Sequence, residues 1–405
     1  MTTHASQTKK LRVLIVGGGV AAAETALGLA QLAPKRTDVT MLAPNADFVY
    51  RPMTVREPFA YAVANRYPLE RIAADAGASL IADELSFIDH DGQSVHTKGG
   101  QEIEYDALVL ALGATAHPHY KHAVTIDDRR LDETLHGLVQ DAEAGHIKSL
   151  AFVSPGRMAW PLPLYELALM TAGRAYDMGM SLTATIVTPE DGPLAIFGST
   201  ASDAVSAALE RAGVKVVASA YAEIPRAGEI VINPGDRVLH ADRVIALPEL
   251  FGPEVRGIQR GDHGFIRVDP HGKTHDEGNI FAAGDAIDFP VKHGGLGSQQ
   301  ADAVAESIAA LAGSGVTPEP FRPVIRGMLL TDDKPLYLTA HMTGGQGASY
   351  SSQVTDTPAW TPAGKIAARY LAPYLDKLDS QTGPRAAPQG GSSQETRKQG
   401  AGVGA

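Results

Sequence analysis

Residues 11–32, LRVLIVGGGVAAAETALGLAQL, decide the fold of this chain. They predict a buried strand at Val13–Val16, a triple-glycine turn and an alanine-rich helix, because a buried parallel strand is a continuous apolar run and small residues let a helix lie close to a sheet. The turn matches the dinucleotide pattern G-x-G-x-x-G/A through Gly17, Gly19 and Ala22. We expect a pyrophosphate at the N-terminus of this helix, where unpaired N–H groups and the helix dipole favour an anion. The alternative is a plain glycine turn in another α/β protein.

The composition limits the classes of function. A chain of 405 residues is long enough for two or three domains, and its 44% apolar and 20% charged residues are ordinary for a globular protein. A formal net charge of −11 argues against nucleic acid or an anionic membrane surface as the main partner. The chain has no cysteine, which rules out a disulfide, a thiolate metal site, a redox-active C-x-x-C pair and a cysteine persulfide mechanism.

The sequence shows no targeting segment. The first ten residues, MTTHASQTKK, lack the apolar region of a secretory signal, and no apolar run reaches the ~20 residues that span a bilayer. We predict a cytoplasmic protein without an integral membrane segment, and leave peripheral membrane contact and a homodimer open.

The second strand is expected at Asp38–Ala43. In many dinucleotide folds an acidic residue ends this strand and binds the ribose, but Ala43 and Pro44 stand there, so we expect ribose recognition either through the backbone and Asn45 or only weakly. Asp47–Phe59 is expected to be a loop at the carboxyl end of the sheet, where ligands bind. Its Arg51 binds a phosphate or lies against a ring system, or else is a solvated surface residue.

Residues 81–113 predict a β-meander that leads into a buried strand. Asp91-Gly92 and Gly99-Gly100 are hairpin turns, and Ala107–Leu112 is the strand. His117 and His119 follow without a third ligand nearby in sequence, so we predict a pair of loop histidines and no metal site.

The chain then repeats its first pattern without the glycines. Ser149–Ser154 is a strand followed by a turn and a helix, but prolines remove N–H donors from this turn and Trp160 fills the space that a pyrophosphate needs. We therefore predict a degenerate NAD-like unit. A remodelled nucleotide site around Gly156 and Glu166 is left open.

A second strong signal lies between residues 264 and 313. A short strand is expected at Ile266–Asp269, and a buried strand at 280–283 ends in Gly284 and Asp285, whose carboxylate is placed to bond a polyol or ribose. Glycines 294, 295 and 297 open a helix with an anion-stabilising N-terminus, and Lys292 and His293 precede it. Asp302 and Glu306 fall on the helix face away from its apolar stripe.

The C-terminal signals are weaker. Trp360–Leu375 predicts a short amphipathic helix that is broken near Pro373, and its Ile366, Tyr370 and Leu371 are expected in the core or in a dimer contact. The residues from about 380 onward are rich in Gly, Gln, Ser and Arg, and we expect them to be disordered.

Three segments together carry a resemblance to a known family: IVGGGVAAAETA (15–26), YDALVLALGA (105–114) and NIFAAGDAIDFPVKHGGLGSQQADAVAESI (279–308). Over roughly residues 11–325 the chain resembles the flavoproteins with two dinucleotide-binding domains, which are pyridine nucleotide-disulfide oxidoreductase-like. More narrowly it resembles the branch of flavocytochrome c sulfide dehydrogenases, sulfide:quinone oxidoreductases and type II NADH dehydrogenases. The resemblance implies an α/β fold of two Rossmann-like domains, the second inserted in the first, and FAD as cofactor.

The resemblance also implies roles for residues. Gly17, Gly19 and the start of the following helix would hold the FAD pyrophosphate, and Asp285 would bind the ribityl chain. The helix opening at Gly295-Leu296 would direct its positive end at the flavin pyrimidine, where reduction places negative charge. Arg51 and Pro52 would lie by the isoalloxazine. The complete set of expected FAD-binding residues is Gly17, Gly19, Val20, Ala21, Ala43, Asn45, Arg51, Pro52, Ala111, Gly113, Gly284, Asp285, Gly295 and Leu296.

The expected domain limits follow from these patterns. They are a flexible N-terminus (1–10), the first part of the FAD domain (11–148), a degenerate NAD-like domain (149–248), the second part of the FAD domain (249–325), a C-terminal segment (326–378) and a disordered tail (379–405).

The departures from the family leave the reaction open. The sulfide enzymes work through paired cysteines, and type II NADH dehydrogenases need a glycine-rich second turn; this chain has neither. The first hypothesis is an FAD-dependent oxidoreductase that uses a quinone-like or other small redox partner beside Lys292 and Trp160, the catalytic candidates. The second is an NAD(P)H-dependent flavin reductase with a remodelled site, and the third is a flavin-bound scaffold or redox sensor without turnover.

Overall fold

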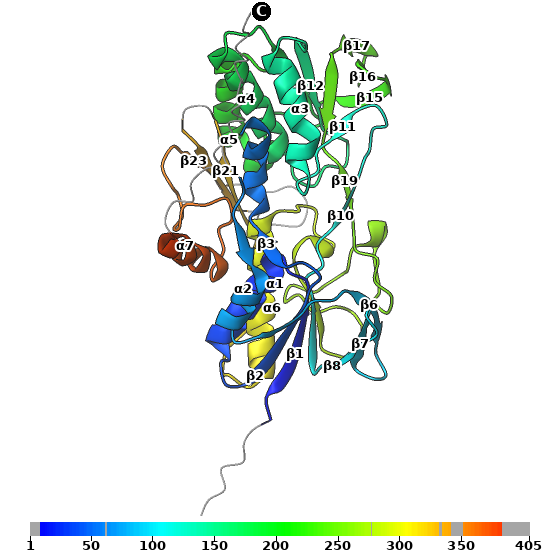
Figure 1. Cartoon of the computed structure of the whole chain (residues 1–405), viewed down its shortest axis with the longest axis vertical. Helices are drawn as coiled ribbons and strands as arrows, with labels where there is room; N and C mark the ends of the chain where they lie inside the picture. The colour runs from blue at the N-terminus through cyan, green and yellow to red at the C-terminus, as the bar shows by residue number, and fades with distance from the viewer. Residues whose placement is uncertain (1–8, 61–62, 277, 332–333, 342–350, 383–405) are drawn as a thin grey trace, which may run out of the picture.

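Two five-stranded parallel sheets, one towards each end of the long axis, organise the chain (Figure 1). This computed structural model describes residues 9–60, 63–276, 278–331, 334–341 and 351–382. Within them, no helix has the length and apolar character needed to cross a membrane.

The first sheet contains the glycine turn. Its strand order is β20-β9-β1-β2-β5, with bounds β1 Leu11–Val16, β2 Thr37–Leu42, β5 Ser79–Ile81, β9 Ala107–Leu110 and β20 Ile280–Ala282. Alternate residues of these strands point to opposite faces, and helices α1 (Val20–Leu32), α2 (Leu69–Asp75) and α6 (Gly294–Leu311) cover one face. The antiparallel meander of β6 (Leu85–Asp89), β7 (Ser94–Thr97) and β8 (Glu102–Glu104) covers the other.

The second sheet repeats this plan. Its order is β11-β18-β12-β13-β14, with bounds β11 Val124–Thr125, β12 Ser149–Val153, β13 Thr183–Val187, β14 Lys215–Val217 and β18 Arg243–Ala246. One face packs on α3 (Leu131–Glu143), α4 (Leu162–Asp177) and α5 (Ser199–Arg211). The other packs on the meander β15 (Tyr221–Arg226), β16 (Glu229–Asn233) and β17 (Arg237–His240). The prediction of two Rossmann-like domains is therefore confirmed.

The chain passes between the two sheets through one antiparallel pair, β10 (Thr115–His117) with β19 (Glu249–Phe251). Strand β11 and helix α3 follow the crossing and pack with the second sheet. The domain limits remain a proposal, and these contacts favour a first boundary earlier than residue 148.

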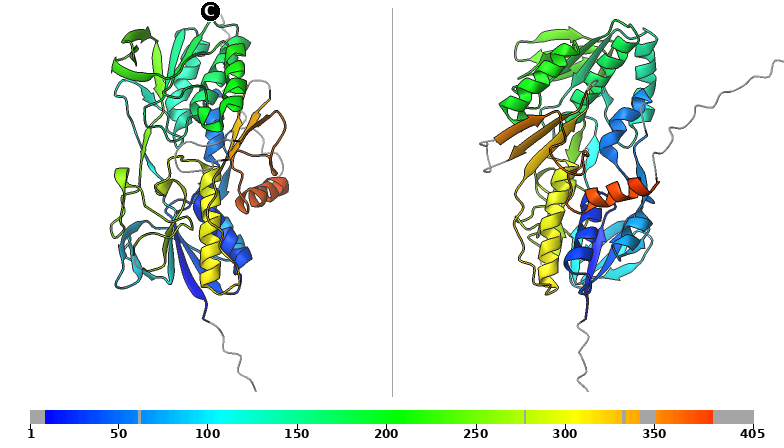
Figure 2. Two further views of the ribbon diagram at one scale, coloured as in Figure 1. Left: turned by 180° about the vertical axis from the view of Figure 1, so that it is seen from behind. Right: turned by 90° about the vertical axis from the view of Figure 1, so that its left-hand side faces the viewer.

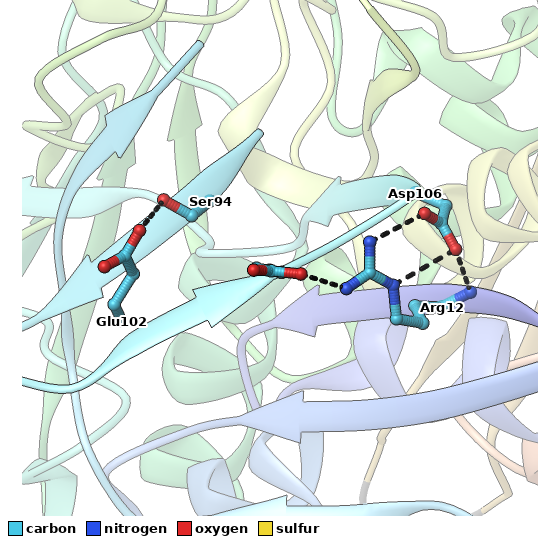
Figure 3. A network of polar contacts seen from close by, with 5 residues as sticks. Arg12, Ser94, Glu102 and Asp106 are labelled. Atoms are coloured by element: carbon cyan, nitrogen blue, oxygen red, sulfur yellow. Dashed lines mark hydrogen bonds and ion pairs between the residues drawn. The ribbon is translucent and has the colours of Figure 1, made fainter. Parts of the chain in front are cut away.

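A partly exposed ion-pair cluster joins the amino ends of the first sheet and its meander (Figure 3). Arg12, on β1, binds Asp106 through its backbone N–H (2.9 Å), Nε (3.2 Å) and a terminal nitrogen (2.9 Å), and it also binds Glu104. The Arg12 guanidinium lowers the pKa of the Asp106 carboxyl. Nearby, the Ser94 hydroxyl donates to Glu102 at 2.9 Å, so the meander is held to itself and to β1 by polar contacts at this end.

A third, smaller sheet and a helix complete the fold. β21 (Val324–Leu329), β22 (Leu336–His341) and β23 (Ser351–Thr355) form an antiparallel sheet, and α7 (Leu371–Thr382) packs against the α1 side of the first core (Figure 2). The predicted helix at Trp360–Leu375 is wrong, because the helix starts at Leu371 and Pro373 falls in its first turn, where proline is tolerated. The predicted core positions Ile366, Tyr370 and Leu371 are buried, as expected.

Four smaller sequence predictions also differ from the structure. The expected loop at 47–59 is β3 (Asp47–Val49), paired with β4 (Arg66–Pro68), followed by the 3₁₀ helix η1 (Arg51–Phe59). Residues 266–269 form isolated bridges, not a strand. Asp302 is turned towards α1 and not towards solvent. The predicted disordered tail begins too early, because residues 379–382 are helical; residues 1–8 and 383–405 lie outside the described ranges.

Candidate functional site

The glycine turn between β1 and α1 is shaped by two close approaches and one open position. Gly17 has φ +133°, and a Cβ there would lie 2.2 Å from the carbonyl oxygen of Ala111 on the neighbouring strand. A Cβ on Gly18 would lie 2.7 Å from a Leu69 methyl, whereas a Cβ on Gly19 would meet no atom within 4 Å. The turn is therefore pressed against the sheet at Gly17 and opens at Gly19, directly before the first turn of α1.

The carboxyl edge of the first sheet brings two distant segments to this turn. The N–H of Ala111 donates to Val16 O at 2.9 Å, and the N–H of Ala283 donates to Leu110 O at 3.2 Å. Gly284 follows, and a Cβ added to it would lie 3.1 Å from Ala21 Cβ on α1. Residues 17, 111 and 284 thus meet at one edge, as the motifs predict for parallel strands.

Asp285 lies in the short 3₁₀ helix η4 (Gly284–Ala286) at this edge. Its turn is tied to α6, because the N–H of Gly284 donates to the side-chain oxygen of Gln300 at 2.9 Å. Burial raises the pKa of the Asp285 carboxyl, and the positive charges of Lys292 and Arg51 oppose that rise. Arg51 is exposed and lies 3.9 Å from Asp128. The Asp285 carboxyl group therefore lies at this edge under the influence of two cations, and its binding of a polyol hydroxyl stays a prediction.

The N-terminus of α6 lies beside this carboxylate. His293 is its N-cap residue, with Gly295 packed under the imidazole, since a Cβ there would lie 2.8 Å from His293 Cε1. His293 Nδ1 has no hydrogen-bond partner among the described residues, and burial lowers the pKa of the ring to about 4. The first turn of α6 holds no acidic residue, so its dipole is not offset there.

The sheet edge and two helix N-termini form a cradle whose donors suit a dinucleotide. This arrangement agrees with the sequence match. A family profile described as pyridine nucleotide-disulphide oxidoreductase matches residues 11–307. The chain belongs to this family. Its relatives are FAD-dependent oxidoreductases, so this protein is an enzyme of that class.

Individual relatives are distant from this oxidoreductase. An NADH dehydrogenase-like protein of Mycobacterium tuberculosis is 27% identical over 295 residues, which is 68% of this chain and 72% of that protein. Rhodocoxin reductase of Rhodococcus erythropolis is 27% identical over 301 residues, 69% of this chain and 66% of that one. A sulfide:quinone oxidoreductase from Aquifex aeolicus has the same fold, with a TM-score of 0.77 at 18% identity and coverage of 92% and 90%.

The remaining cofactor candidates lie around the same edge with different exposure. Ala43 is buried and contacts the Gly18 position, whereas Asn45 is exposed just beyond the end of β2. Gly113 follows Ala111 with φ +73° and open space at its Cβ position. Leu296 is fully buried. Pro52 is half-buried in η1. The role of each of these residues stays a prediction.

The two catalytic candidates lie in adjacent segments. The N–H of Lys292 donates to Ala159 O at 3.2 Å, while the Trp160 ring packs on His293 with a centroid distance of 4.3 Å. Lys292 Nζ donates to the carbonyl of Ile287 and lies 3.7 Å from the Phe265 ring centroid. Burial lowers the pKa of this amine to about 8. Both contacts of Lys292 Nζ are made within the protein, so a catalytic role for Lys292 stays a prediction.

The second turn of the oxidoreductase is closed by its own residues. Pro161 is the N-cap of α4 and Pro163 is its second residue, so N–H donors are missing where a pyrophosphate would bind. The Trp160 ring also contacts Phe197, with a centroid distance of 5.8 Å. A Cβ on Gly156 would lie 3.1 Å from Tyr221. These contacts agree with the expectation of a degenerate turn.

Glu166, expected as a candidate for nucleotide binding, is instead fully buried and paired. Lys365 Nζ donates to both of its carboxylate oxygens at 2.6 Å, and the N–H of Leu330 donates to one of them at 2.9 Å. The proximity of the Lys365 ammonium opposes the burial that raises the pKa of Glu166. The alternative left open by the sequence, a remodelled nucleotide site around Gly156 and Glu166, finds no support at Glu166, because its carboxylate joins α4 to the C-terminal segment.

Two polar residues near the site, Glu190 and Tyr50, could not be recognised from the sequence. Glu190, after β13, accepts from the Tyr165 hydroxyl at 2.7 Å, and burial raises its pKa to about 7. Tyr50 accepts the N–H of Ile366 at 2.9 Å. No local motif marks these residues, since each partner is distant in sequence. Among the described residues no group of three or more His, Asp or Glu side chains could hold a metal, and His119 pairs with Glu249 at 3.2 Å.

Proposed function

We propose that this oxidoreductase holds FAD across the carboxyl edge of the first sheet and exchanges electrons with a quinone-like or other small redox partner without cysteine chemistry. One observation carries the proposal. The open turn at Gly19, the carboxylate of Asp285 and the N-terminus of α6 lie at one edge, while the matching turn of the second sheet is filled by Trp160 and its prolines.

The residues of the edge have separate tasks. The amides at the start of α1 bind the pyrophosphate, and Asp285 accepts a hydrogen bond from a ribityl hydroxyl. The positive end of the α6 dipole stabilises negative charge on the flavin pyrimidine. When bound, FAD supplies the two-electron redox chemistry.

The partner would approach the side walled by Trp160 and His293. The Trp160 ring is tilted by 39° against the imidazole of His293, and this half-buried indole supplies apolar aromatic surface that suits an aromatic redox partner. Lys292, with its pKa lowered to about 8, can hold or release a proton at Nζ near neutral pH. These features support a quinone-like partner more than a sugar or an acyl substrate.

The test starts from purified enzyme with its flavin quantified. The flavin is reduced by light without oxygen and mixed with a water-soluble quinone in a stopped-flow instrument. We expect reoxidation much faster than by air, and slower reoxidation in Trp160→Ala with unchanged flavin content. Reoxidation by the quinone no faster than by air would contradict the quinone-like partner.

A second candidate function is NAD(P)H-dependent flavin reduction. It is favoured by the NADH dehydrogenase-like relatives at 26–27% identity. The closed second turn and the paired Glu166 count against standard nucleotide binding. Anaerobic addition of NADH or NADPH decides the matter: bleaching of the flavin absorbance supports this function, and an unchanged spectrum with both dismisses it. The cytoplasmic location and the homodimer remain predictions from the sequence.

A further inference from the structure

Residues 364–371 lead into α7 and lie across α1 and α6, the two helices that begin at the carboxyl edge of the first sheet. Glu24 of α1 binds the end of this segment. Glu24 is fully buried. One of its oxygens accepts the N–H groups of Arg369 at 2.7 Å and Tyr370 at 2.9 Å, and the other accepts that of Leu371 at 2.6 Å. These donors belong to the start of α7, where N–H groups have no intrahelical partner and a negative charge is favourable.

Helices α1 and α6 are shaped to receive the 364–371 segment. Gly28 lies in the middle of α1, and a Cβ there would lie 3.1 Å from both the Tyr370 ring and Ala305 Cβ. The missing side chain therefore makes room for the Tyr370 ring beside α6. At the surface, Arg369 forms an ion pair with Glu306 of α6 at 3.0 Å.

The other end of the same segment reaches the site. Lys365 is bound to Glu166 on α4, and Ile366 packs over Gly294, since a Cβ there would lie 3.3 Å from Ile366 Cγ1. The Ser298 hydroxyl lies 3.4 Å from the carbonyl oxygen of Ala367. Between the Glu24 and Glu166 contacts, the segment thus covers the first turn of α6.

We propose that Glu24 is a positioning residue, whose carboxylate fixes the backbone of residues 369–371 and thereby holds the 364–371 segment over the N-terminus of α6. The proposal deepens the proposed function, because that N-terminus is the end assigned to the flavin pyrimidine. It assigns no contact between Glu24 and the cofactor.

A second carboxyl group faces Glu24 from α6. Burial, the charge of Glu24 and a hydrogen bond to Glu24 raise the pKa of Asp302 to about 8. The other groups that face it are Glu306 of α6 and Arg369 and Tyr370 of the segment. Burial and the neighbouring charge of Glu24 thus favour the neutral form of Asp302 in this contact.

This pairing gives the contact a direction of pH dependence. Undocking of the 364–371 segment admits water to Asp302 and lowers its pKa from about 8 towards the value of a free aspartate, near 4. The undocked state therefore gains stability relative to the docked state as the pH rises between these values. Above about pH 8, two carboxylates face each other in a buried contact.

The test is hydrogen exchange of the flavin-loaded, full-length enzyme, measured by mass spectrometry. In Glu24→Gln we expect peptides covering residues 364–371 to exchange at least tenfold faster, while peptides of β1 and β9 keep their protection. The control is Glu306→Gln, which removes a partner of Arg369 and leaves the backbone contacts intact; it should behave as the wild type. Unchanged exchange in Glu24→Gln, or faster exchange over the whole chain, overturns the proposal.

A second variant keeps the test decisive if Glu24→Gln does not fold. Asp302→Asn can donate to Glu24 but cannot ionise. Wild-type protection factors at residues 364–371 should fall severalfold between pH 6 and pH 8.5, and those of Asp302→Asn should not. Equal pH dependence in the two proteins overturns the proposal.

The reaction with quinone supplies a readout that mere structural support would not move. In Glu24→Gln we expect the second-order rate constant for reoxidation of the reduced flavin to fall at least fivefold at unchanged flavin content, and an unaltered constant counts against positioning. The exchange experiments need no turnover. If no quinone reacts with the wild type, the proposed partner fails and exchange still decides the role of Glu24.

Discussion

At the scale of single residues, Gly17 and Gly19 differ in what a methyl group would meet. In Gly17→Ala the new Cβ would lie 2.2 Å from Ala111 O, at a φ of +133° that L-residues avoid. We expect a fall in the free energy of unfolding of more than about 2 kcal/mol. In Gly19→Ala the φ of −92° is allowed and the space is empty, so stability should be kept while FAD content falls. Urea unfolding and flavin absorbance check both; equal stability of the two variants would contradict the assignment.

Asp285 provides a second prediction. In Asp285→Ala a bound ribityl hydroxyl loses a charged partner, which is worth about 1.5–3 kcal/mol. We expect lower FAD occupancy, measured as the ratio of flavin to protein absorbance. Asp288→Asn, in the same loop and exposed, is the matched control and should keep its flavin. Normal occupancy in Asp285→Ala would show that the motif is misplaced.

His293 predicts a loss of stability in acid. Burial lowers its pKa to about 4, whereas the unfolded chain binds this proton near pH 6.5. The unfolded state is therefore favoured as the pH falls from about 6.5 to about 4, by up to about 3 kcal/mol. The free energy of unfolding, measured in urea at several pH values, should fall less steeply in His293→Asn than in the wild type. Parallel curves would rule out a buried neutral imidazole.

At the scale of elements, the Glu166–Lys365 pair ties α4 to the C-terminal segment. Both side chains are almost fully buried, so Lys365→Met leaves an uncompensated carboxylate and should cost about 3–5 kcal/mol of stability. Adding Glu166→Gln should restore most of the loss, because the amide oxygen still accepts the Leu330 N–H. The exposed Arg130–Glu133 pair is the control, and Arg130→Met should leave the stability nearly unchanged. Additive losses in the double variant would contradict the pairing.

The elements also show where pattern reading succeeds. The strand and helix at residues 11–32 follow from local periodicity, because the same residues that form the elements also face the core. Residues 360–370 carry apolar residues at helical spacing, yet they run without a helix between α1, α6 and α4. Ile366 packs on α6, the Tyr370 ring on α1 and the Trp360 ring on Tyr337 of β22, and periodicity cannot distinguish that arrangement from one amphipathic face.

At the scale of the whole molecule, FAD should stabilise one sheet more than the other. The cradle is made of residues near 17, 111 and 285, all on the first sheet. Removing FAD should lower the melting temperature, since a ligand at 100 times its Kd contributes about 2.7 kcal/mol. Hydrogen exchange should rise in peptides of β1 and β20 and stay constant in β12 and β13. Equal changes in both sheets would contradict a site confined to the first.

The sequence predicts only those parts of the candidate site that are formed by residues close together in the chain. The turn at Gly17–Gly19 and the strand end at Asp285 each have a recognisable neighbourhood, and they define the cofactor edge. Tyr370 lies 346 positions from Glu24, and Lys365 lies 199 positions from Glu166. The sequence around a single residue contains no pattern that identifies so distant a partner. For this reason the pairing of Glu166 with Lys365 could not be predicted from the sequence.

The strand order of the first sheet has a consequence for biosynthesis. Strand β9 lies between β1 and the edge strand β20, whose Ile280 pairs with Leu108. All strands of the second sheet lie between β9 and β20 in the sequence, so β20 is synthesised last. At ~5–20 residues per second a ribosome needs roughly 10–30 s to make that stretch. The inserted unit can fold during this interval, whereas the earlier strands keep one edge unpaired. The nascent chain therefore passes through a period in which chaperones have an exposed strand edge to protect and the cofactor has no complete site to enter.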